Sequence, residues 1–180
     1  MLIDRYNSQL LMVDVQERLA PAIADIAGVE AQIAILLRTA REMAVPVIIS
    51  EQYRKGLGGT LPSLAGLMPG VQPIEKMEFS CFANADLQAA LSGNPGNATI
   101  LCGIEAHVCV LQTALEMRAA GRLVFVVADA VGSRRPESRS VALDRMRMAG
   151  IDVVTTEMVL FEWLRSAAAP EFKPVSQLIR

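Results

Sequence analysis

The stretch ATILCGIEAHVCV, residues 98–110, decides the fold, because a buried strand passes into a helix within it. Its first residues include the β-branched types that favour strands, and Gly103 closes the strand. A helix is predicted over 107–120, since Gly121 stands where a helix C-terminus favours glycine. The stretch therefore predicts a strand-to-helix junction with Cys109 near the front of the helix.

The same alternation of strand and helix runs along the chain. Short β-rich runs alternate with stretches of helical periodicity. The segment 51–70 is rich in glycine and proline and is expected to be a long surface loop with one helical turn, and GNPGN (93–97) is expected to be a turn. Strands are predicted at 9–13, 46–50, 71–76, 98–103, 123–129 and 151–155, and helices at 29–43, 86–91, 107–120, 136–150 and 156–165.

Six strands in strict alternation with helices predict a parallel sheet covered on both faces, in one domain that spans residues 1–180. Right-handed crossovers favour a Rossmann-like, doubly wound α/β/α fold with strand order 3-2-1-4-5-6. Ligands of such sheets bind beyond the carboxyl ends of the strands, where the order reverses. Asp14 follows the first strand and Cys109 follows the fourth, so a site is expected between them.

Composition narrows the classes of function. The 180 residues are 52% hydrophobic and 20% charged, which predicts a mostly buried structure or a homo-oligomer that hides surface. A net charge of -2 without a basic block argues against nucleic acid or an anionic membrane as partner. No apolar run approaches the roughly 20 residues of a membrane span. Three cysteines without a CxxC pair fit a reducing compartment, so a soluble cytoplasmic protein is expected.

Three side chains at strand ends are candidates for chemistry, although each has an ordinary alternative. Asp14 could be a helix cap, Lys76 a surface lysine and Cys109 a small core residue. Together they supply a base, a cation and a nucleophile. A helix N-terminus and a nearby lysine are expected to bring the pKa of Cys109 below the ~8.5 of a free thiol. His107 is the only histidine, which excludes a histidine-rich metal site.

These residues lie in segments that resemble the isochorismatase-like cysteine hydrolases, a superfamily that includes nicotinamidases and N-carbamoylsarcosine amidases. The resemblance covers roughly residues 8–165, and two segments (50–64 and 142–164) look like the isochorismatase domain-containing subgroup. Its main motifs are LLMVDVQE (10–17), EKMEFSCF (75–82), LCGIEAHVCVLQTALEM (101–117) and VVADAVGSR (126–134).

The resemblance implies a catalytic triad of Asp14, Lys76 and Cys109. It also implies a cis peptide bond between Ile104 and Glu105. The backbone N–H groups of Glu105 and Cys109 would then form an oxyanion hole. Candidates for the wall of the substrate pocket are Gln16, Gln52, Tyr53, Phe79 and Phe82.

Two departures from family patterns define the expected reaction. Metal-dependent nicotinamidases place an aspartate and two histidines after the second strand, where this chain reads SEQYRKG (50–56), so no metal or other cofactor is expected. Isochorismatases that cleave a vinyl ether carry glycine where Cys109 stands. The resemblance therefore implies a metal-independent cysteine hydrolase that cleaves an amide or carbamoyl C–N bond of a small molecule through a thioester.

Two other functions stay open: a vinyl-ether hydrolase with Asp14 as its acid, and a catalytically idle module that acts through oligomeric contacts. Blocking the Cys109 thiol separates them, because only the amide hydrolase depends on it. A homo-oligomer is also expected from TEMVLFEWL (156–164), which holds more apolar side chains than one core-facing stripe needs. These side chains are Met158, Leu160, Phe161, Trp163 and Leu164.

Overall fold

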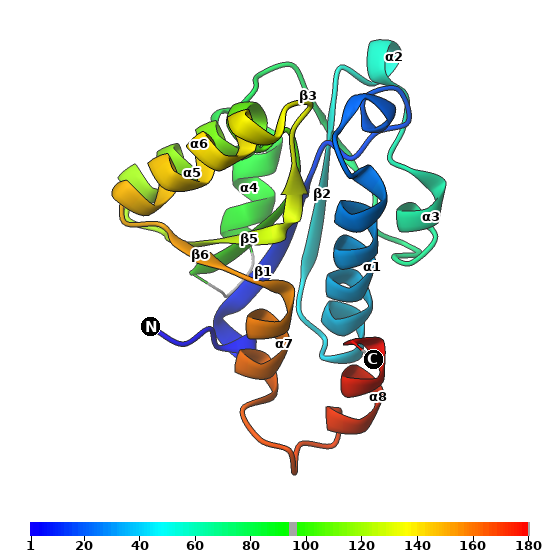
Figure 1. Ribbon diagram of the computed structural model, residues 1–180, viewed down its shortest axis with the longest axis vertical. Helices are drawn as coiled ribbons and strands as arrows, with labels where there is room; N and C mark the ends of the chain where they lie inside the picture. Colours follow the sequence, from blue (N-terminus) through cyan, green and yellow to red (C-terminus); the bar gives the residue numbers. More distant parts are fainter. Residues whose placement is uncertain (94–96, 180) are drawn as a thin grey trace.

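A six-stranded parallel sheet forms the centre of the computed structural model, which describes residues 1–93 and 97–179. The strand order β3-β2-β1-β4-β5-β6 confirms the predicted topology (Figure 1). Within the turn expected at 93–97, residues 94–96 lie outside the described residues. The strands are β1 (Ser8–Val13), β2 (Val47–Gln52), β3 (Ile74–Lys76), β4 (Ala98–Ile104), β5 (Leu123–Gly132) and β6 (Asp152–Val154).

Helices cover both faces of the sheet and enclose a separate hydrophobic core on each (Figure 1). One core lies under α1 (Ile26–Glu42) and α7 (Thr156–Leu164), with α3 (Pro62–Ala65) and α8 (Phe172–Ser176) at its border. The other lies under α4 (Ala85–Gly93), α5 (Leu111–Ala119) and α6 (Pro136–Met148). Among the described residues, no helix combines the length and the apolar character that crossing a membrane requires.

Strand β1 lies in the middle of the sheet and serves both cores, which explains its continuous apolar sequence. Successive side chains of a strand point to opposite faces. Accordingly, Leu10 and Met12 pack into the core under α1, and Leu11 and Val13 pack into the core under α5. Burial on both faces holds β1 rigidly at the position that presents Asp14 to the site.

Glycine at the end of β4 allows the two central strands to approach each other closely. Gly103 has a φ of +118°, and a Cβ atom added there would lie 2.1 Å from the carbonyl oxygen of Val13. Any side chain would therefore push β4 away from β1. The strand order reverses between these two strands, so Gly103 sets the width of the sheet beside the site.

Some elements differ from the sequence predictions. The predicted loop 51–70 contains two short helices, α2 (Arg54–Leu57) and α3, and the C-terminal tail contains α8. The predicted helix 107–120 begins as a π-helical turn, η4 (Ala106–Val110), before α5. Strand β5 is longer than predicted, because its register with β4 shifts between the pairs Leu101–Val126 and Gly103–Val131.

The expectation that α7 has too many apolar side chains for the core is wrong for most of them. Leu160, Trp163 and Leu164 are buried within the chain itself, because α7 packs against both α1 and β5. Only Met158 and Phe161 of the five named side chains are exposed.

Candidate active site

Asp14, Lys76 and Cys109 all lie at the carboxyl edge of the sheet. Asp14 directly follows β1, Lys76 is the last residue of β3, and Cys109 lies in the η4 turn after β4. Although β2 separates β1 from β3, Lys76 Nζ lies 2.7 Å from Asp14 Oδ2, and both side chains are buried. The structure therefore brings together residues that the sequence places on strands two positions apart.

Lys76 reaches across the end of β2 because the loop after β3 folds back around its ammonium group. Nζ also lies 2.6 Å from Gln52 Oε1 and 3.1 Å from the carbonyl oxygens of both Glu78 and Phe79. With Asp14 these make four oxygen acceptors for three N–H donors. Burial is the largest single effect and lowers the pKa of Lys76, but the charge of Asp14, the hydrogen bond to Asp14 and the two neighbouring cysteines together outweigh it, so the pKa is raised and Lys76 stays charged.

The second carboxylate oxygen of Asp14 has its own partner on β2. Ser50 Oγ donates to Asp14 Oδ1 at 2.8 Å. Ser50 Oγ in turn accepts a hydrogen bond from Cys81 Sγ at 3.4 Å. Cys81 opens the short helix η3 (Cys81–Ala83), and its backbone N–H donates to Thr113 Oγ1 at 2.8 Å. Asp14 is thus held through one oxygen by Lys76 and through the other by Ser50.

Cys109 is only 5% exposed and belongs to the core under α5. Burial raises the pKa of its thiol, the charge of Asp14 raises it further, and Lys76 lowers it without offsetting the other two effects. The expectation of a lowered pKa is therefore wrong. The main physical reason is the burial of the thiol, followed by the charge of Asp14, so Cys109 rests as a thiol and needs a base before it can attack.

The residue before the η4 turn is fixed by contacts of its side chain and of its backbone carbonyl. The peptide bond between Ile104 and Glu105 is cis. The Glu105 carboxylate is held by Arg134, through its backbone N–H at 3.0 Å and its Nε at 3.1 Å. Val108 N–H donates to the carbonyl of Glu105, which fixes the turn that carries Cys109.

The residues predicted for the pocket wall lie in different environments. Gln16 is buried, and its side-chain amide is engaged by the backbone of Gln52 and Gly58 at 2.7–3.0 Å. Gln52 faces Lys76, whereas Tyr53 and Phe79 are exposed and Phe82 is half-buried. His107, whose role the sequence did not indicate, has Nδ1 3.0 Å from Ser133 Oγ.

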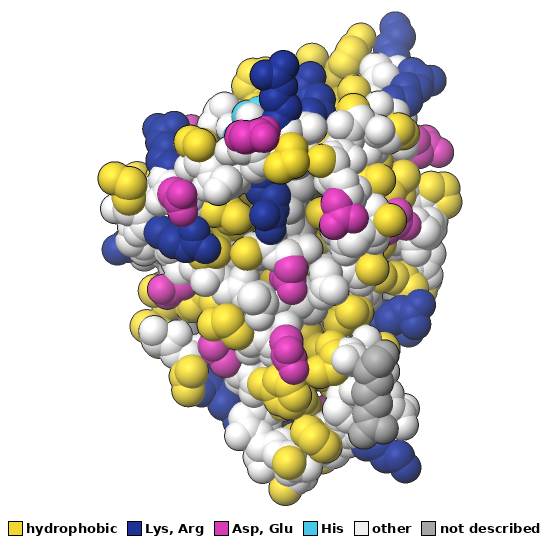
Figure 2. Space-filling model, in the orientation of Figure 1, with side chains coloured by type: hydrophobic (Ala, Val, Ile, Leu, Met, Phe, Trp, Pro, Cys, Tyr) yellow, Lys and Arg dark blue, Asp and Glu magenta, His cyan; other side chains and the backbone are white. Residues whose placement is uncertain are grey.

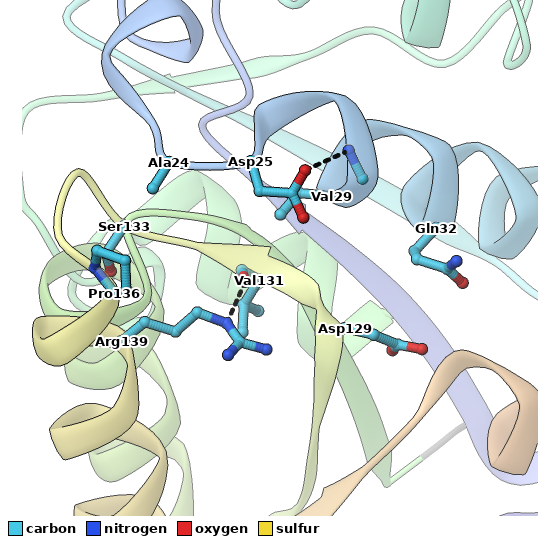
Figure 3. A pocket seen from close by; sticks show the side chains of 10 residues that line it. Ala24, Asp25, Val29, Gln32, Asp129, Val131, Ser133, Pro136 and Arg139 are labelled. Carbon is cyan, nitrogen blue, oxygen red and sulfur yellow. Dashed lines mark hydrogen bonds between the residues drawn. The ribbon is translucent and has the colours of Figure 1, made fainter.

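A separate pocket of about 350 Å³ lies between the start of α1, the end of β5 and the start of α6 (Figure 3). Arg139 enters it from α6, and Figure 3 shows Asp25 and Asp129 on other sides of the same hollow. The guanidinium donates to the carbonyl of Val131 at 2.9 Å and to that of Ala128, beside the register shift of β5. Asp14, Lys76 and Cys109 do not line this pocket.

Ser50 and Cys81 are the site residues that sequence reasoning missed. A serine at the end of an apolar strand resembles a turn residue, and a buried cysteine resembles core filler. The available signal was spacing, because Ser50 and Gln52 stand two apart on β2 and so share a face of the strand beside β1. Across residues 1–93 and 97–179, no three His, Cys, Asp or Glu side chains gather as a metal site would require.

Comparison with known proteins identifies the family. The family model for the isochorismatase domain matches residues 8–158. Isochorismatase domain-containing protein 2A of Mus musculus is 38% identical over 175 residues, which cover 97% of this chain and 83% of that protein. The MAR1 ribonuclease structure from Caenorhabditis elegans has a TM-score of 0.94 and 35% identity, and covers 99% of this chain and 92% of its own.

Two structures of a third relative, YcaC, add information about assembly and reactivity. YcaC from Escherichia coli, described as an octameric hydrolase of unknown specificity, has a TM-score of 0.94 and 26% identity, covering 99% of this chain and 89% of that one. YcaC from Pseudomonas aeruginosa, solved with hexane-2,5-diol and covalent acrylamide, has a TM-score of 0.92 and 25% identity, covering 98% and 91%. These matches show that the chain belongs to the isochorismatase family and has the hydrolase fold of that family.

Proposed function

We propose that the protein is a metal-independent cysteine hydrolase that cleaves the C–N bond of a small amide or carbamoyl compound. The observation that carries this proposal is the buried Asp14–Lys76 pair, 2.7 Å apart, next to the thiol of Cys109. A carboxylate held in this way serves as the base that a protonated thiol requires. The proposal involves no cofactor.

In the first half of the reaction, Asp14 takes the proton of Cys109 while sulfur attacks the carbonyl carbon. The oxygen of the tetrahedral intermediate accepts hydrogen bonds from the backbone N–H groups of Glu105 and Cys109. The place of Glu105 directly before the η4 turn that carries Cys109 supports this role. Lys76 offsets the negative charge that builds up on sulfur and oxygen.

In the second half, the proton on Asp14 passes to the nitrogen of the leaving amine as the C–N bond breaks. The acyl group then remains on Cys109 as a thioester. Asp14 next takes a proton from water, whose oxygen attacks the thioester, and the proton returns to sulfur when the acid product leaves. Each step uses the same carboxylate in alternating roles.

The covalent acrylamide in Pseudomonas aeruginosa YcaC supports a nucleophile in a relative with this fold. The alternative reaction, vinyl-ether cleavage with Asp14 as the acid, is less well supported. Both carboxylate oxygens of Asp14 accept hydrogen bonds, from Lys76 and from Ser50. That arrangement favours Asp14 as a general base over Asp14 as a general acid.

The proposal includes a cytoplasmic location and a homo-oligomeric state. The three cysteines are free and buried thiols, as expected in a reducing compartment. The octameric state described for Escherichia coli YcaC supports self-association.

The test is a panel of small amides and carbamoyl compounds, incubated with the protein and read by intact mass for a Cys109 adduct and by release of amine. We expect at least one compound to give both signals with the wild type and neither with Cys109→Ala. Cys102→Ala is the matched control, because Cys102 is a buried thiol of the opposite core. A vinyl-ether substrate and an RNA oligonucleotide complete the panel, and turnover of either that survives in Cys109→Ala would contradict the proposal.

A further inference from the structure

A chain of hydrogen bonds approaches Asp14 from the side opposite Lys76. The Cys81 thiol donates to Ser50 Oγ at 3.4 Å, and the Ser50 hydroxyl donates to Asp14 Oδ1 at 2.8 Å. Ser50, Asp14 and Cys81 are all buried, so water does not readily replace either bond. The triad reaction described above uses neither Ser50 nor Cys81.

We propose that Ser50 is a positioning residue that holds the Asp14 carboxylate for proton transfer from Cys109, and that Cys81 orients the Ser50 hydroxyl. This inference rests on the proposed function and adds the device that keeps its base in place.

The need for such a device follows from the geometry of a carboxylate. Asp14 has a φ of 52° directly after β1, and its side chain can still rotate about two bonds. Lys76 fixes one oxygen only. A second donor on the other oxygen fixes the plane of the carboxylate, and misplacement of a reacting group by about 1 Å can cost on the order of 10²-fold in rate.

Cys81 supplies the direction of the second hydrogen bond. A hydroxyl can donate one hydrogen bond and accept others. When Cys81 donates to Ser50 Oγ, the Ser50 proton is free to point at Asp14. Burial raises the pKa of Cys81 to about 11, so it keeps the proton that it donates throughout the neutral range. The titratable groups that face Asp14 are Lys76 from β3, Cys109 from η4 and Cys81 from η3.

The experiment measures alkylation of Cys109 by acrylamide between pH 6 and pH 9, read by peptide mass. The S–C bond forms as the S–H bond breaks, and the α-carbon of acrylamide takes up a proton. In the wild type Asp14 receives the thiol proton, so the rate should change little with pH. Cys109 of Ser50→Ala should be labelled about 10- to 100-fold more slowly at pH 7. Its labelling rate should then rise by up to about tenfold for each pH unit, because hydroxide replaces Asp14 as the base.

Conservative variants distinguish positioning from a loss of packing. Ser50→Thr keeps the hydroxyl and should recover most of the rate. Cys81→Ser keeps a donor and should behave like the wild type, whereas Cys81→Ala should slow labelling. Cys102→Ala is the matched control and should leave the pH profile unchanged. Cys102 belongs to the core on the other face of the sheet, where its thiol contacts the Leu11 carbonyl. If Ser50→Ala does not fold, the two Cys81 variants carry the same comparison.

A double-mutant cycle tests whether Ser50 acts through Asp14. In an Asp14→Asn background, Ser50→Ala should change the labelling rate by less than about twofold, because the group it positions is gone. An equal slowing in both backgrounds, or an unshifted pH profile in Ser50→Ala, overturns the inference. Failure of the proposed function looks different: acrylamide labels Cys109 with the expected dependence on Ser50, but no amide in the panel is turned over. A wild type that acrylamide does not label overturns both.

Discussion

The charge of Lys76 is divided among four oxygen atoms, which leaves the Cys109 thiol without a counterion of its own. Among the neighbouring charges, the carboxylate of Asp14 then has the largest effect on the pKa of Cys109, and it opposes a thiolate. This distribution favours a mechanism in which proton removal and attack are coupled. A pre-formed thiolate would require Lys76 to face sulfur instead.

The separate contributions of Lys76 and Asp14 can be measured by comparing alkylation with turnover. Lys76→Met should raise the pKa of Cys109 further and slow both processes, because it removes the charge that lowers that pKa. Asp14→Asn should slow alkylation at neutral pH and make its rate rise with pH, because hydroxide must then take the thiol proton, and it should reduce turnover by about 10²–10⁴-fold. Iodoacetamide labelling and amine release measure the two rates.

Stability provides the control for these two variants. The pair is buried, so removing one partner should lower the free energy of unfolding by about 3–5 kcal/mol, measured by denaturant titration. The double variant Asp14→Asn, Lys76→Met should lose less free energy of unfolding than the two single variants lose in total. Full turnover in Asp14→Asn would remove Asp14 from the mechanism.

The positions of Asp14, Lys76 and Cys109 could be predicted from the sequence because each lies at or after the end of a strand that the hydrophobic pattern reveals. Their partners could not. Ser50 contacts Asp14 only because β2 lies beside β1, and Cys81 contacts Ser50 only because the loop after β3 folds back. Both contacts are tertiary, and neither residue type signals them locally.

Among the elements, strands with apolar runs and helices bounded by glycine or proline follow the sequence closely. The departures occur where tertiary contacts outweigh local preference. The η4 turn is π-helical where it leaves the sheet, and β5 continues past its predicted end through a shifted register. The carbonyls of Ala128 and Val131 beside that shift accept hydrogen bonds from Arg139 of α6. No local sequence pattern predicts this contact.

Gly103, near the end of β4, is the position whose substitution should reduce the stability of the fold the most. Gly103→Ala combines a φ of +118° with a Cβ atom 2.1 Å from the Val13 carbonyl oxygen, so β1 and β4 must separate. We expect a loss of about 2–6 kcal/mol in the free energy of unfolding, or failure to fold. Gly121→Ala is the matched control: its φ is +78° but nothing lies within 4 Å of the added atom, so only about 1–2 kcal/mol should be lost. Equal losses in a urea titration would show that strand separation is not the cause.

Several large hydrophobic side chains are exposed on the surface of the molecule. Figure 2 shows hydrophobic side chains among charges of both signs, with several at the lower end of this face, over α7 and the segment that follows it. Met158 and Phe161 of α7 are exposed, as are Met1 and Leu2 of the N-terminal segment. These two segments are joined, because Ile3 N–H donates to Glu162 at 2.7 Å. We call these four exposed side chains the α7 surface.

The α7 surface should be buried between copies of this chain. A closed homo-oligomer hides such a surface without exposing a new one, and the description of Escherichia coli YcaC as octameric agrees with self-association. Light scattering at micromolar concentration should give a mass that is a multiple of 19.4 kDa. Phe161→Glu should reduce that mass, because it places a charge where water is excluded. Val141→Glu, at an equally apolar exposed position on α6, is the comparison, and it should leave the mass unchanged. A monomeric wild type would refute self-association, and a loss of mass in Val141→Glu alone would move the interface from α7 to α6.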